Sequence, residues 1–243
     1  MTPPLSIVIP AYNEEGRLGP SLARTRDFLR RRRLRAEVLV VDDGSTDATP
    51  QLVRRLARGW KALRLLALER NQGKGAAVRA GVLAARGRCI LFSDADLSTP
   101  LEELALLQAR LDLGADIAIG SRALNRAKVE VSQPLYRVLA GRSFNLMVQL
   151  LSLRGIQDTQ CGFKLFTAAA ARRCFSVQQV PRFGFDVEVL FLARKAGYRI
   201  DEVPVRWINS ADSRVRPFRD GGRAFLDLAL IRLYDWQGLY RGL

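Results

Sequence analysis

The sequence contains no histidine, and this absence limits the chemistry open to the chain. Histidine is the commonest general base near neutral pH and a frequent metal ligand. Any catalysis must therefore depend on carboxylates, on arginine and lysine, or on a bound metal ion. Cysteine is also scarce: Cys89, Cys161 and Cys174 form an odd, widely spaced set, which predicts neither a disulfide framework nor a zinc site.

Long apolar runs are missing as well. The longest uncharged stretches, residues 1–13 and 143–153, are shorter than the roughly 20 apolar residues that a membrane-spanning helix needs. The N-terminus lacks the basic region and small-residue cleavage site of a signal peptide. We therefore expect a cytoplasmic protein.

Negative charge is scarce relative to positive charge. The chain has 39 lysines and arginines, only five of them lysine, against 24 acidic residues, and its net charge is +15. Such an excess favours an anionic partner: nucleic acid, a membrane surface or phosphate groups. A genome rich in G and C, which favours arginine codons, explains part of the excess equally well.

What the chain does contain is a regular alternation of short aliphatic runs and helical segments. The aliphatic runs lack polar alternation, which is typical of strands buried on both faces of a parallel sheet. The alternation predicts an α/β fold with a right-handed, doubly wound, mainly parallel sheet. The predicted strands are 5–10, 36–41, 63–68, 89–92 and 116–120; the predicted helices are 15–32, 47–58, 75–86 and 100–113.

Polar residues follow each of the five predicted strands. In sheets of this kind, ligands bind beyond the carboxyl ends of the strands. Five polar ends at one edge predict a site for a polar ligand. The segments are PAYNEE (10–15), DDGSTD (42–47), ERNQGKG (69–75), SDAD (93–96) and GSR (120–122).

Asp94 and Asp96 stand one residue apart directly after a buried strand. Like charges this close destabilise the fold unless a positive group lies between them, and divalent cations prefer carboxylate oxygens. The pair therefore predicts a metal site; a plain acidic surface turn is the weaker alternative. Thr99–Glu102 has the pattern of a capping box with Pro100 at the first helical position, so Thr99 is expected to be structural.

Two further segments have both a binding and a structural interpretation. Asp43 can accept a hydrogen bond from a nucleotide base, with Asp42 bracing the turn, but DDGSTD also suits a helix N-terminus. Lys74 lies between two glycines at a predicted helix start, which suits a phosphate. Neither GxxxxGK[ST] nor a GxGxxG after a strand is present, so a P-loop and a dinucleotide fold are disfavoured.

Five motifs taken together resemble glycosyltransferase family 2, in particular its branch of dolichyl-phosphate glucosyltransferases and mannose synthases. They are IVIPAYNEE, VVDDGSTD, NQGKGAAVRAG, DADLSTP and CGFKLF, and they cover nearly the whole chain in order. The resemblance implies a GT-A fold, a nucleotide-diphosphate sugar donor, Mg²⁺ or Mn²⁺, and inversion at the anomeric carbon.

The resemblance also implies roles for individual residues. Asp94 and Asp96 would form the metal-binding DxD motif. The catalytic set would comprise these two aspartates with Arg122 and Arg137. Lys74 and Arg122 would lie close to the diphosphate and the sugar. Many mannose synthases of this branch have glutamine where this chain has Ser98, which favours UDP-glucose over GDP-mannose as donor. The nucleotide-sugar site would comprise Pro10, Tyr12, Glu14, Asp43, Lys74, Asp94 and Arg214.

The second half of the chain indicates what kind of molecule accepts the sugar. A sugar hydroxyl would need a general base, for which Asp158, Asp186 or Glu188 could serve, whereas a polyprenyl phosphate is already an anion. Residues 135–155 form an amphipathic stretch in which Arg137 would meet the acceptor phosphate and the leucines would meet the prenyl chain; packing on the sheet is the plainer interpretation. Residues 224–243 resemble an interfacial helix.

The sequence thus predicts one glycosyltransferase domain with C-terminal amphipathic helices. Residues 1–122 would bind the nucleotide sugar, 123–220 would form the acceptor side and 221–243 the last helix, with the protein peripheral on the inner face of the membrane. One alternative is a family 2 transferase that uses GDP-mannose or a non-lipid acceptor. A second is a nucleotidyltransferase, but the nucleotide-triphosphate loop that such an enzyme needs is absent from this sequence. A third is a basic nucleic-acid-binding module. The last would not explain five polar strand ends, so no nucleic acid partner is expected.

Overall fold

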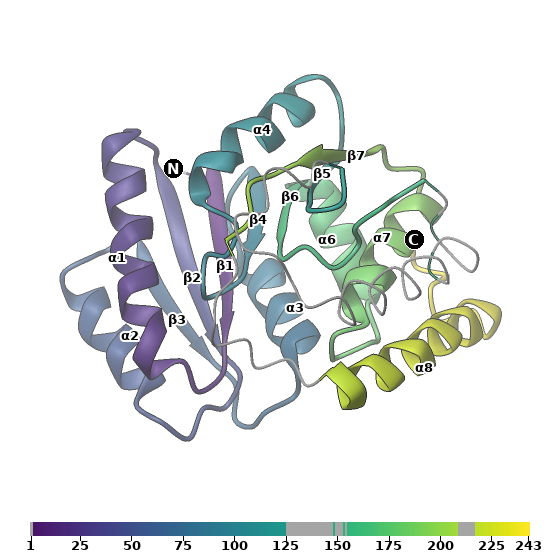
Figure 1. Ribbon diagram of the computed structural model, residues 1–243, viewed down its shortest axis with the longest axis horizontal. Helices are drawn as coiled ribbons and strands as arrows, with labels where there is room; N and C mark the ends of the chain where they lie inside the picture. The colour runs from purple at the N-terminus through teal and green to yellow at the C-terminus, as the bar shows by residue number, and fades with distance from the viewer. Residues whose placement is uncertain (1, 125–147, 149–152, 154, 209–216) are drawn as a thin grey trace.

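The computed structural model describes residues 2–124, 148, 153, 155–208 and 217–243, the side chains of 217–225 excepted. A seven-stranded sheet in the order β3-β2-β1-β4-β6-β5-β7 forms the middle of the molecule (Figure 1). Its strands are β1 (Leu5–Ala11), β2 (Ala36–Asp42), β3 (Leu63–Ala67), β4 (Cys89–Ser93), β5 (Ile117–Ser121), β6 (Phe163–Thr167) and β7 (Ile200–Pro204).

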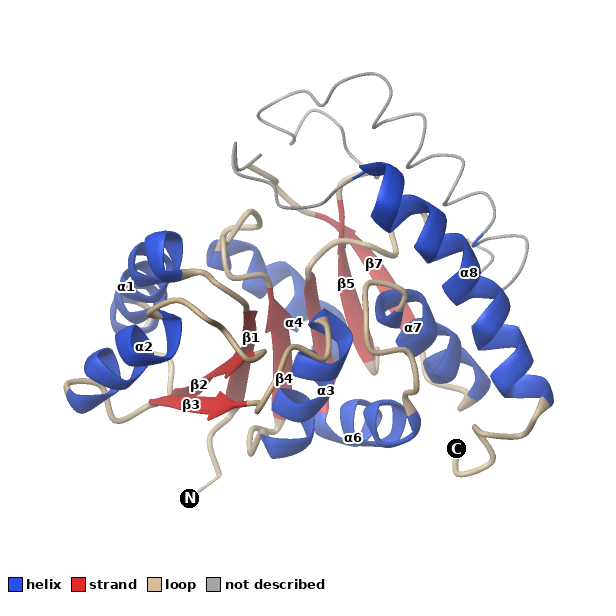
Figure 2. Ribbon diagram, turned by 90° about the horizontal axis from the view of Figure 1, so that it is seen from below, coloured by secondary structure: helices blue, strands red, loops and turns tan. Residues whose placement is uncertain are grey.

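Helices cover both faces of this sheet, as Figures 1 and 2 show. Alternate residues of each strand enter opposite cores: Ile7 and Ile9 pack on one side, and Val8 packs on the other. The helices α1 (Glu15–Arg31), α2 (Thr49–Arg58) and α4 (Leu104–Asp112) contribute to the first core. The second core contains α3 (Lys74–Ala84), α6 (Ala168–Val177), α7 (Phe185–Lys195) and α8 (Pro217–Trp236).

The predicted strands and helices of the first 122 residues are confirmed to within a few residues. The exception is the start of the fourth helix, where a capping box was expected. Pro100 is the N-cap of a short 3₁₀ helix, η1 (Leu101–Glu103), and no side chain caps it. The Oγ1 of Thr99 instead lies 3.8 Å from the Sγ of Cys161. The capping-box prediction is therefore wrong, and Thr99 contacts the segment that leads into β6.

Strand β6 was not among the predicted strands, although its residues belong to the CGFKLF motif. It pairs antiparallel with β4 on one side and with β5 on the other, whereas β1 is parallel to both β2 and β4. Lys164 interrupts its apolar run, which hides it from a search for aliphatic segments. Because β6 runs in reverse, its beginning lies at the edge where the other strands end.

The C-terminal helix begins and ends earlier than the predicted 221–243, since α8 runs from Pro217 to Trp236 and turns follow it. Leu228 and Ile231 face the second core, while Leu226 and Trp236 are exposed. Figure 2 shows α8 running beside α7 at one side of the molecule. Among the described helices, none has the length and apolar character needed to cross a membrane.

Candidate active site

The carboxyl ends of β1 to β5 lie at one edge of the sheet, as their pairing registers require. Ala11 pairs with Asp42, and Asp42 pairs with Ala67 of β3. At β4, Ser93 pairs with Phe163, the first residue of β6. The polar segments after the five strands therefore meet as expected, and residues 158–162 join them because β6 enters the sheet from the same edge.

The two aspartates of the predicted DxD motif lie at the end of β4, in the middle of this edge. The backbone N–H of Asp94 donates to the carbonyl of Gly162 over 3.0 Å, which ties the motif to the start of β6. Oδ1 of Asp96 accepts from the N–H of Ser98 over 3.0 Å. Leu97 adopts a φ of 51°, so the chain turns sharply directly after Asp96.

Lys74 begins α3 and forms an ion pair with the first aspartate of the motif. Its Nζ lies 2.7 Å from Oδ1 of Asp94 and 5.2 Å from the centre of the Phe92 ring. Burial by itself would lower the pKa of Lys74, but the nearby carboxylates of Asp94 and Asp186 outweigh it, so its pKa lies above the ordinary value. The lysine is therefore a cation at the carboxylate pair.

Asp43 is buried and is held by the backbone of the next polar segment. Its Oδ1 accepts from the N–H of Gln72 and its Oδ2 from the N–H of Gly73, each over 2.8 Å. Burial raises the pKa of Asp43, and these two hydrogen bonds oppose the increase without cancelling it. Asp43 thus fixes the turn in front of Lys74. Its role towards a nucleotide base stays a prediction.

The remaining residues predicted for the nucleotide lie at the end of β1. Pro10 is buried within the strand, and the side chain of Tyr12 is 41% exposed beyond it. Glu14 is buried, and Nε and Nη2 of Arg17 donate to its two carboxylate oxygens. Its backbone N–H donates to Oγ1 of Thr49. Glu14 therefore holds α1 and α2 together at this edge.

Arg122 follows β5 and makes a two-pronged contact with Asp158. Nε donates to Oδ2 over 2.7 Å and Nη2 donates to Oδ1 over 2.8 Å. The guanidinium carbon lies 5.6 Å from the centre of the Trp207 ring. Arg122 thus lies at the predicted edge, and sequence reasoning missed that Asp158 and Trp207 hold it.

The three carboxylates considered as general bases are all engaged by other groups. Asp158 pairs with Arg122, and Asp186 pairs with Lys164, both of those side chains being only 2% exposed. Glu188 is fully buried and accepts from the N–H groups of Gln179 and Val180. Their engagement disfavours all three as the base for a sugar hydroxyl.

Two predicted residues, Arg137 and Arg214, lie outside the described residues, as does most of the amphipathic stretch 135–155. One residue that the sequence did not single out as functional does belong to the site. A Cβ at Gly162 would lie 2.0 Å from Oδ2 of Asp94, so the carboxylate occupies space that only a glycine leaves open. Gly162 belongs to the CGFKLF motif and Asp94 to DADLSTP. Their contact depends on the pairing of β6 with β4, which the sequence pattern did not predict.

The sequence profile described as "Glycosyl transferase family 2" matches residues 6–175. The chain belongs to glycosyl transferase family 2. Among its relatives, the dolichyl-phosphate β-glucosyltransferase of Drosophila melanogaster is 40% identical, over 98% of this chain and 77% of the relative. The human enzyme of the same name is 38% identical, over 99% and 78%. The Saccharomyces cerevisiae enzyme is 34% identical, over 98% and 76%.

Solved structures agree with the fold of this glycosyltransferase. Glucosyl-3-phosphoglycerate synthase from Mycobacterium tuberculosis, in complex with Mn²⁺, UDP-glucose and phosphoglyceric acid, superimposes with a TM-score of 0.69 at 18% identity, covering 94% of this chain and 79% of that one. Mannosyl-3-phosphoglycerate synthase from Rubrobacter xylanophilus gives 0.67 at 18% identity, covering 97% and 75%. At such identity these matches show the GT-A type of fold alone.

The carboxylate pair fits a divalent metal ion held jointly with a ligand. Asp94 and Asp96 supply hard oxygen donors, and the ion pair with Lys74 shows that positive charge is accommodated beside them. Within the described part of the chain, no group of three or more His, Cys, Asp or Glu side chains could hold an ion alone. Mg²⁺ is commonly bound by one or two carboxylates together with substrate phosphates, and this donor set matches that arrangement.

Proposed function

We propose that this glycosyltransferase transfers glucose from UDP-glucose to the phosphate of a polyprenyl phosphate, with inversion at the anomeric carbon and with Mg²⁺ or Mn²⁺ bound at Asp94 and Asp96. The observation that carries the proposal is the identity of 34–40%, over nearly the whole chain, to enzymes named dolichyl-phosphate β-glucosyltransferase. A structural neighbour solved with Mn²⁺ and UDP-glucose, and another solved with Mn²⁺ and UDP, support the choice of donor and ion.

The state of the carboxylates supports a phosphate as the acceptor. A hydroxyl must lose its proton as it attacks, and the three carboxylates considered for this task are paired with other groups. A phosphate monoester is already an anion at pH 7, since its second pKa is near 6. Its oxygen can form the bond to the anomeric carbon while the bond from that carbon to the diphosphate breaks, the electron pair going to the diphosphate.

The described residues have distinct tasks in this reaction. Asp94 and Asp96 would hold the metal ion, which when bound offsets the charge that develops on the departing diphosphate. Lys74 and Arg122 would place fixed positive charge beside the phosphates, while Pro10, Tyr12, Glu14 and Asp43 shape the nucleotide site. The proposed division of labour gives residues 1–122 to the donor and 123–220, with Arg137, to the acceptor; Arg214 would face the donor phosphates.

We also place a membrane surface among the partners. On α8, the exposed side chains of Leu226, Leu230, Leu233 and Trp236 recur at helical spacing on the side away from Leu228 and Ile231. Together with the net charge of +15, this apolar stripe suits an anionic lipid surface, where a prenyl chain would be embedded. The protein would then be peripheral, on the membrane face where the nucleotide sugar is available.

One experiment tests donor and acceptor together. Purified protein is given ¹³C-labelled UDP-glucose and unlabelled GDP-mannose with Mn²⁺, and is offered a polyprenyl phosphate or, separately, 3-phosphoglycerate. We expect labelled hexosyl-phosphoryl-polyprenol by mass spectrometry, and none after EDTA treatment. Unlabelled hexose in the lipid product would overturn the donor assignment, and transfer only to 3-phosphoglycerate would overturn the acceptor.

A further inference from the structure

The contact between Arg122 and Asp158 leaves one edge of the guanidinium open. The Nε and Nη2 atoms face the carboxylate, and the backbone N–H of Arg122 donates to the same Oδ2 over 2.9 Å. Asp158 thus occupies the side of the guanidinium that carries Nε. The opposite edge, which carries Nη1 and the second N–H of Nη2, has no hydrogen bond to any described residue. Two parallel N–H groups on such an edge match two oxygens of a phosphate.

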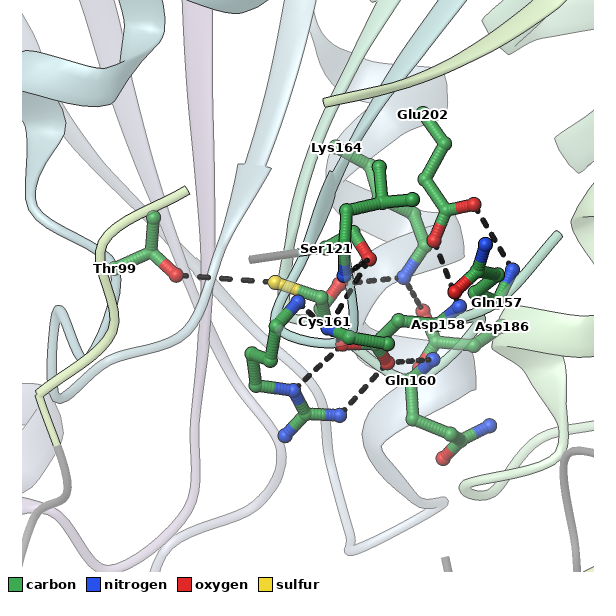
Figure 3. Close-up of polar contacts among 12 residues, drawn as sticks. Thr99, Ser121, Gln157, Asp158, Gln160, Cys161, Lys164, Asp186 and Glu202 are labelled. Atoms are coloured by element: carbon green, nitrogen blue, oxygen red, sulfur yellow. Dashed lines mark hydrogen bonds and ion pairs between the residues drawn. The ribbon is translucent and has the colours of Figure 1, made fainter. Parts of the chain in front are cut away.

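A second carboxylate fixes the position of Asp158. Glu202 on β7 accepts from the N–H of Gln157 through Oε2 and from the N–H of Asp158 through Oε1, over 2.9 and 2.8 Å. The N–H of Gln160 donates to Oδ1 of Asp158 over 3.2 Å. Figure 3 shows the hydrogen bonds that join Glu202 to the segment carrying Gln157 and Asp158. The order of contacts therefore runs from strand β7 through the turn at 157–160 to Arg122.

Asp158 is ionised, as its ion pair with Arg122 requires. Its side chain is only 8% exposed. Burial would raise the pKa of Asp158, but the adjacent Arg122 guanidinium and its hydrogen bonds outweigh burial and hold the pKa below its ordinary value. The carboxylate therefore stays ionised at neutral pH, and it is a poor proton acceptor while Arg122 is bound.

We propose that Asp158 is a positioning residue, which with Glu202 behind it holds Arg122 so that the free guanidinium edge binds a phosphate at the reaction site. This inference rests on the proposed function, in which phosphate occurs on both substrates: as the diphosphate of the donor and as the acceptor group. A buried carboxylate that orients an arginine from one side removes the rotational freedom that the arginine would otherwise lose on binding.

Substitution of Asp158 by asparagine tests the role, because asparagine keeps the shape but loses the charge. We expect Asp158→Asn to lower kcat/KM at least tenfold. Arg122→Ala should lower it further, and adding Asp158→Asn to Arg122→Ala should cost almost nothing more, since the aspartate acts through the arginine. Glu202→Gln, which leaves Asp158 in place, should give a smaller loss in the same kinetic constant.

Glu37→Gln is the matched control. Glu37 is also a buried carboxylate that accepts from an arginine and a backbone N–H, those of Arg64 and Arg86, but it lies at the start of β2, at the opposite edge of the sheet. It should lower thermal stability as Asp158→Asn does and leave kcat/KM at the wild-type value. The positioning role is overturned if Asp158→Asn loses no more activity than Glu37→Gln, or if its loss multiplies with that of Arg122→Ala.

Binding of UDP in the presence of Mn²⁺, measured by calorimetry, identifies which phosphate is held. A weaker affinity in Asp158→Asn assigns the edge to the donor, while an unchanged affinity with a raised KM for polyprenyl phosphate assigns it to the acceptor. If the wild type makes no polyprenyl product, the proposed function fails. In that case weaker UDP binding in Asp158→Asn still supports the positioning role, and unchanged UDP binding overturns it.

Discussion

A side chain at position 162 would occupy the place of the Asp94 carboxylate. The Cβ of an alanine there would lie 2.0 Å from Oδ2 and 2.2 Å from Cγ of Asp94. Both are atoms of a side chain that can rotate, whereas the backbone of β6 and β4 is held by pairing on both sides. The clash is therefore relieved by movement of the carboxylate, which changes the proposed metal site and spares the sheet.

Gly162→Ala should consequently fold but bind the donor poorly. We expect the Mn²⁺ concentration needed for half-maximal activity, and the Kd for UDP in the presence of Mn²⁺, to rise by about tenfold or more, as when a group that orients a metal ligand is lost. Titration of activity with Mn²⁺ measures the first quantity and calorimetry the second. The thermal midpoint should change by only a few degrees.

Gly16→Ala provides the control, because an added Cβ there meets no atom within 4 Å. It should leave both metal dependence and UDP affinity unchanged. A Gly162→Ala protein with wild-type dependence on Mn²⁺ would show that the position of the Asp94 carboxylate is unimportant for the ion.

At the scale of elements, a series of contacts runs from the C-terminus to the start of α3. The hydroxyl of Tyr240 donates to Oε1 of Glu188 over 2.6 Å, and Glu188 accepts from the N–H groups of Gln179 and Val180. The neighbouring Gln178 donates through Nε2 to the carbonyl of Gly75 over 3.2 Å. The segment after α8 thus supports the loop before α7, and this loop supports the helix start that carries Lys74.

Tyr240→Phe should destabilise the fold in a pH-dependent way. Loss of one hydrogen bond to a buried carboxylate should lower the free energy of unfolding by about 1–3 kcal/mol near pH 7. Burial raises the pKa of Glu188 above 4.5 and the Tyr240 hydroxyl partly opposes this, so its removal raises the pKa further. A folded state that binds protons more tightly than the unfolded state loses stability as pH rises. The deficit of the variant should therefore grow between pH 4.5 and pH 7.5.

Urea unfolding across this pH range measures the deficit. Tyr198→Phe is the matched control: its ring packs against the same core, and the described residues show no hydrogen bond to its hydroxyl. A deficit in Tyr240→Phe that stays constant with pH, or that Tyr198→Phe reproduces, would contradict the role of Glu188.

The elements also show which parts of the site could be predicted from sequence. Strands β1, β2, β4 and β5 are short apolar runs that are almost wholly buried, and the edge strand β3 is a partly buried run rich in leucine, so the hydrophobic pattern located all five. Their parallel direction placed Asp43, Lys74, Asp94 and Arg122 at one edge. Strand β6 contains a buried lysine whose partner, Asp186, is 22 residues away. Its reversed direction depends on pairing between distant segments, and so the contacts of Gly162 with Asp94 and of Asp158 with Arg122 were not predictable.

At the scale of the whole molecule, positive charge and the outer face of α8 bear on the proposed membrane contact. A net charge of +15 gives long-range attraction to anionic lipids, which salt screens over about 10 Å at 0.1 M ionic strength. Apolar side chains that enter the interface add attraction that salt does not screen. Leu226, at 65% exposed, belongs to the stripe on α8, and Leu113, also 65% exposed, lies at the end of α4.

These two leucines make a balanced comparison, because the same substitution changes charge and exposed apolar area equally. We expect wild-type protein to sediment with vesicles of phosphatidylcholine and phosphatidylserine, and to do so less as salt is raised from 0.1 to 0.5 M. Leu226→Glu should lower the partition coefficient by about tenfold, since burial of a leucine side chain contributes about 1.5–3 kcal/mol. Leu113→Glu should show only the small loss that comes from lowering the net charge of +15 by one unit. Both variants share this electrostatic loss, and it should shrink as salt is raised. Equal partitioning of the two variants at 0.5 M salt would show that α8 does not enter the lipid interface, because at that ionic strength only the buried apolar area distinguishes them.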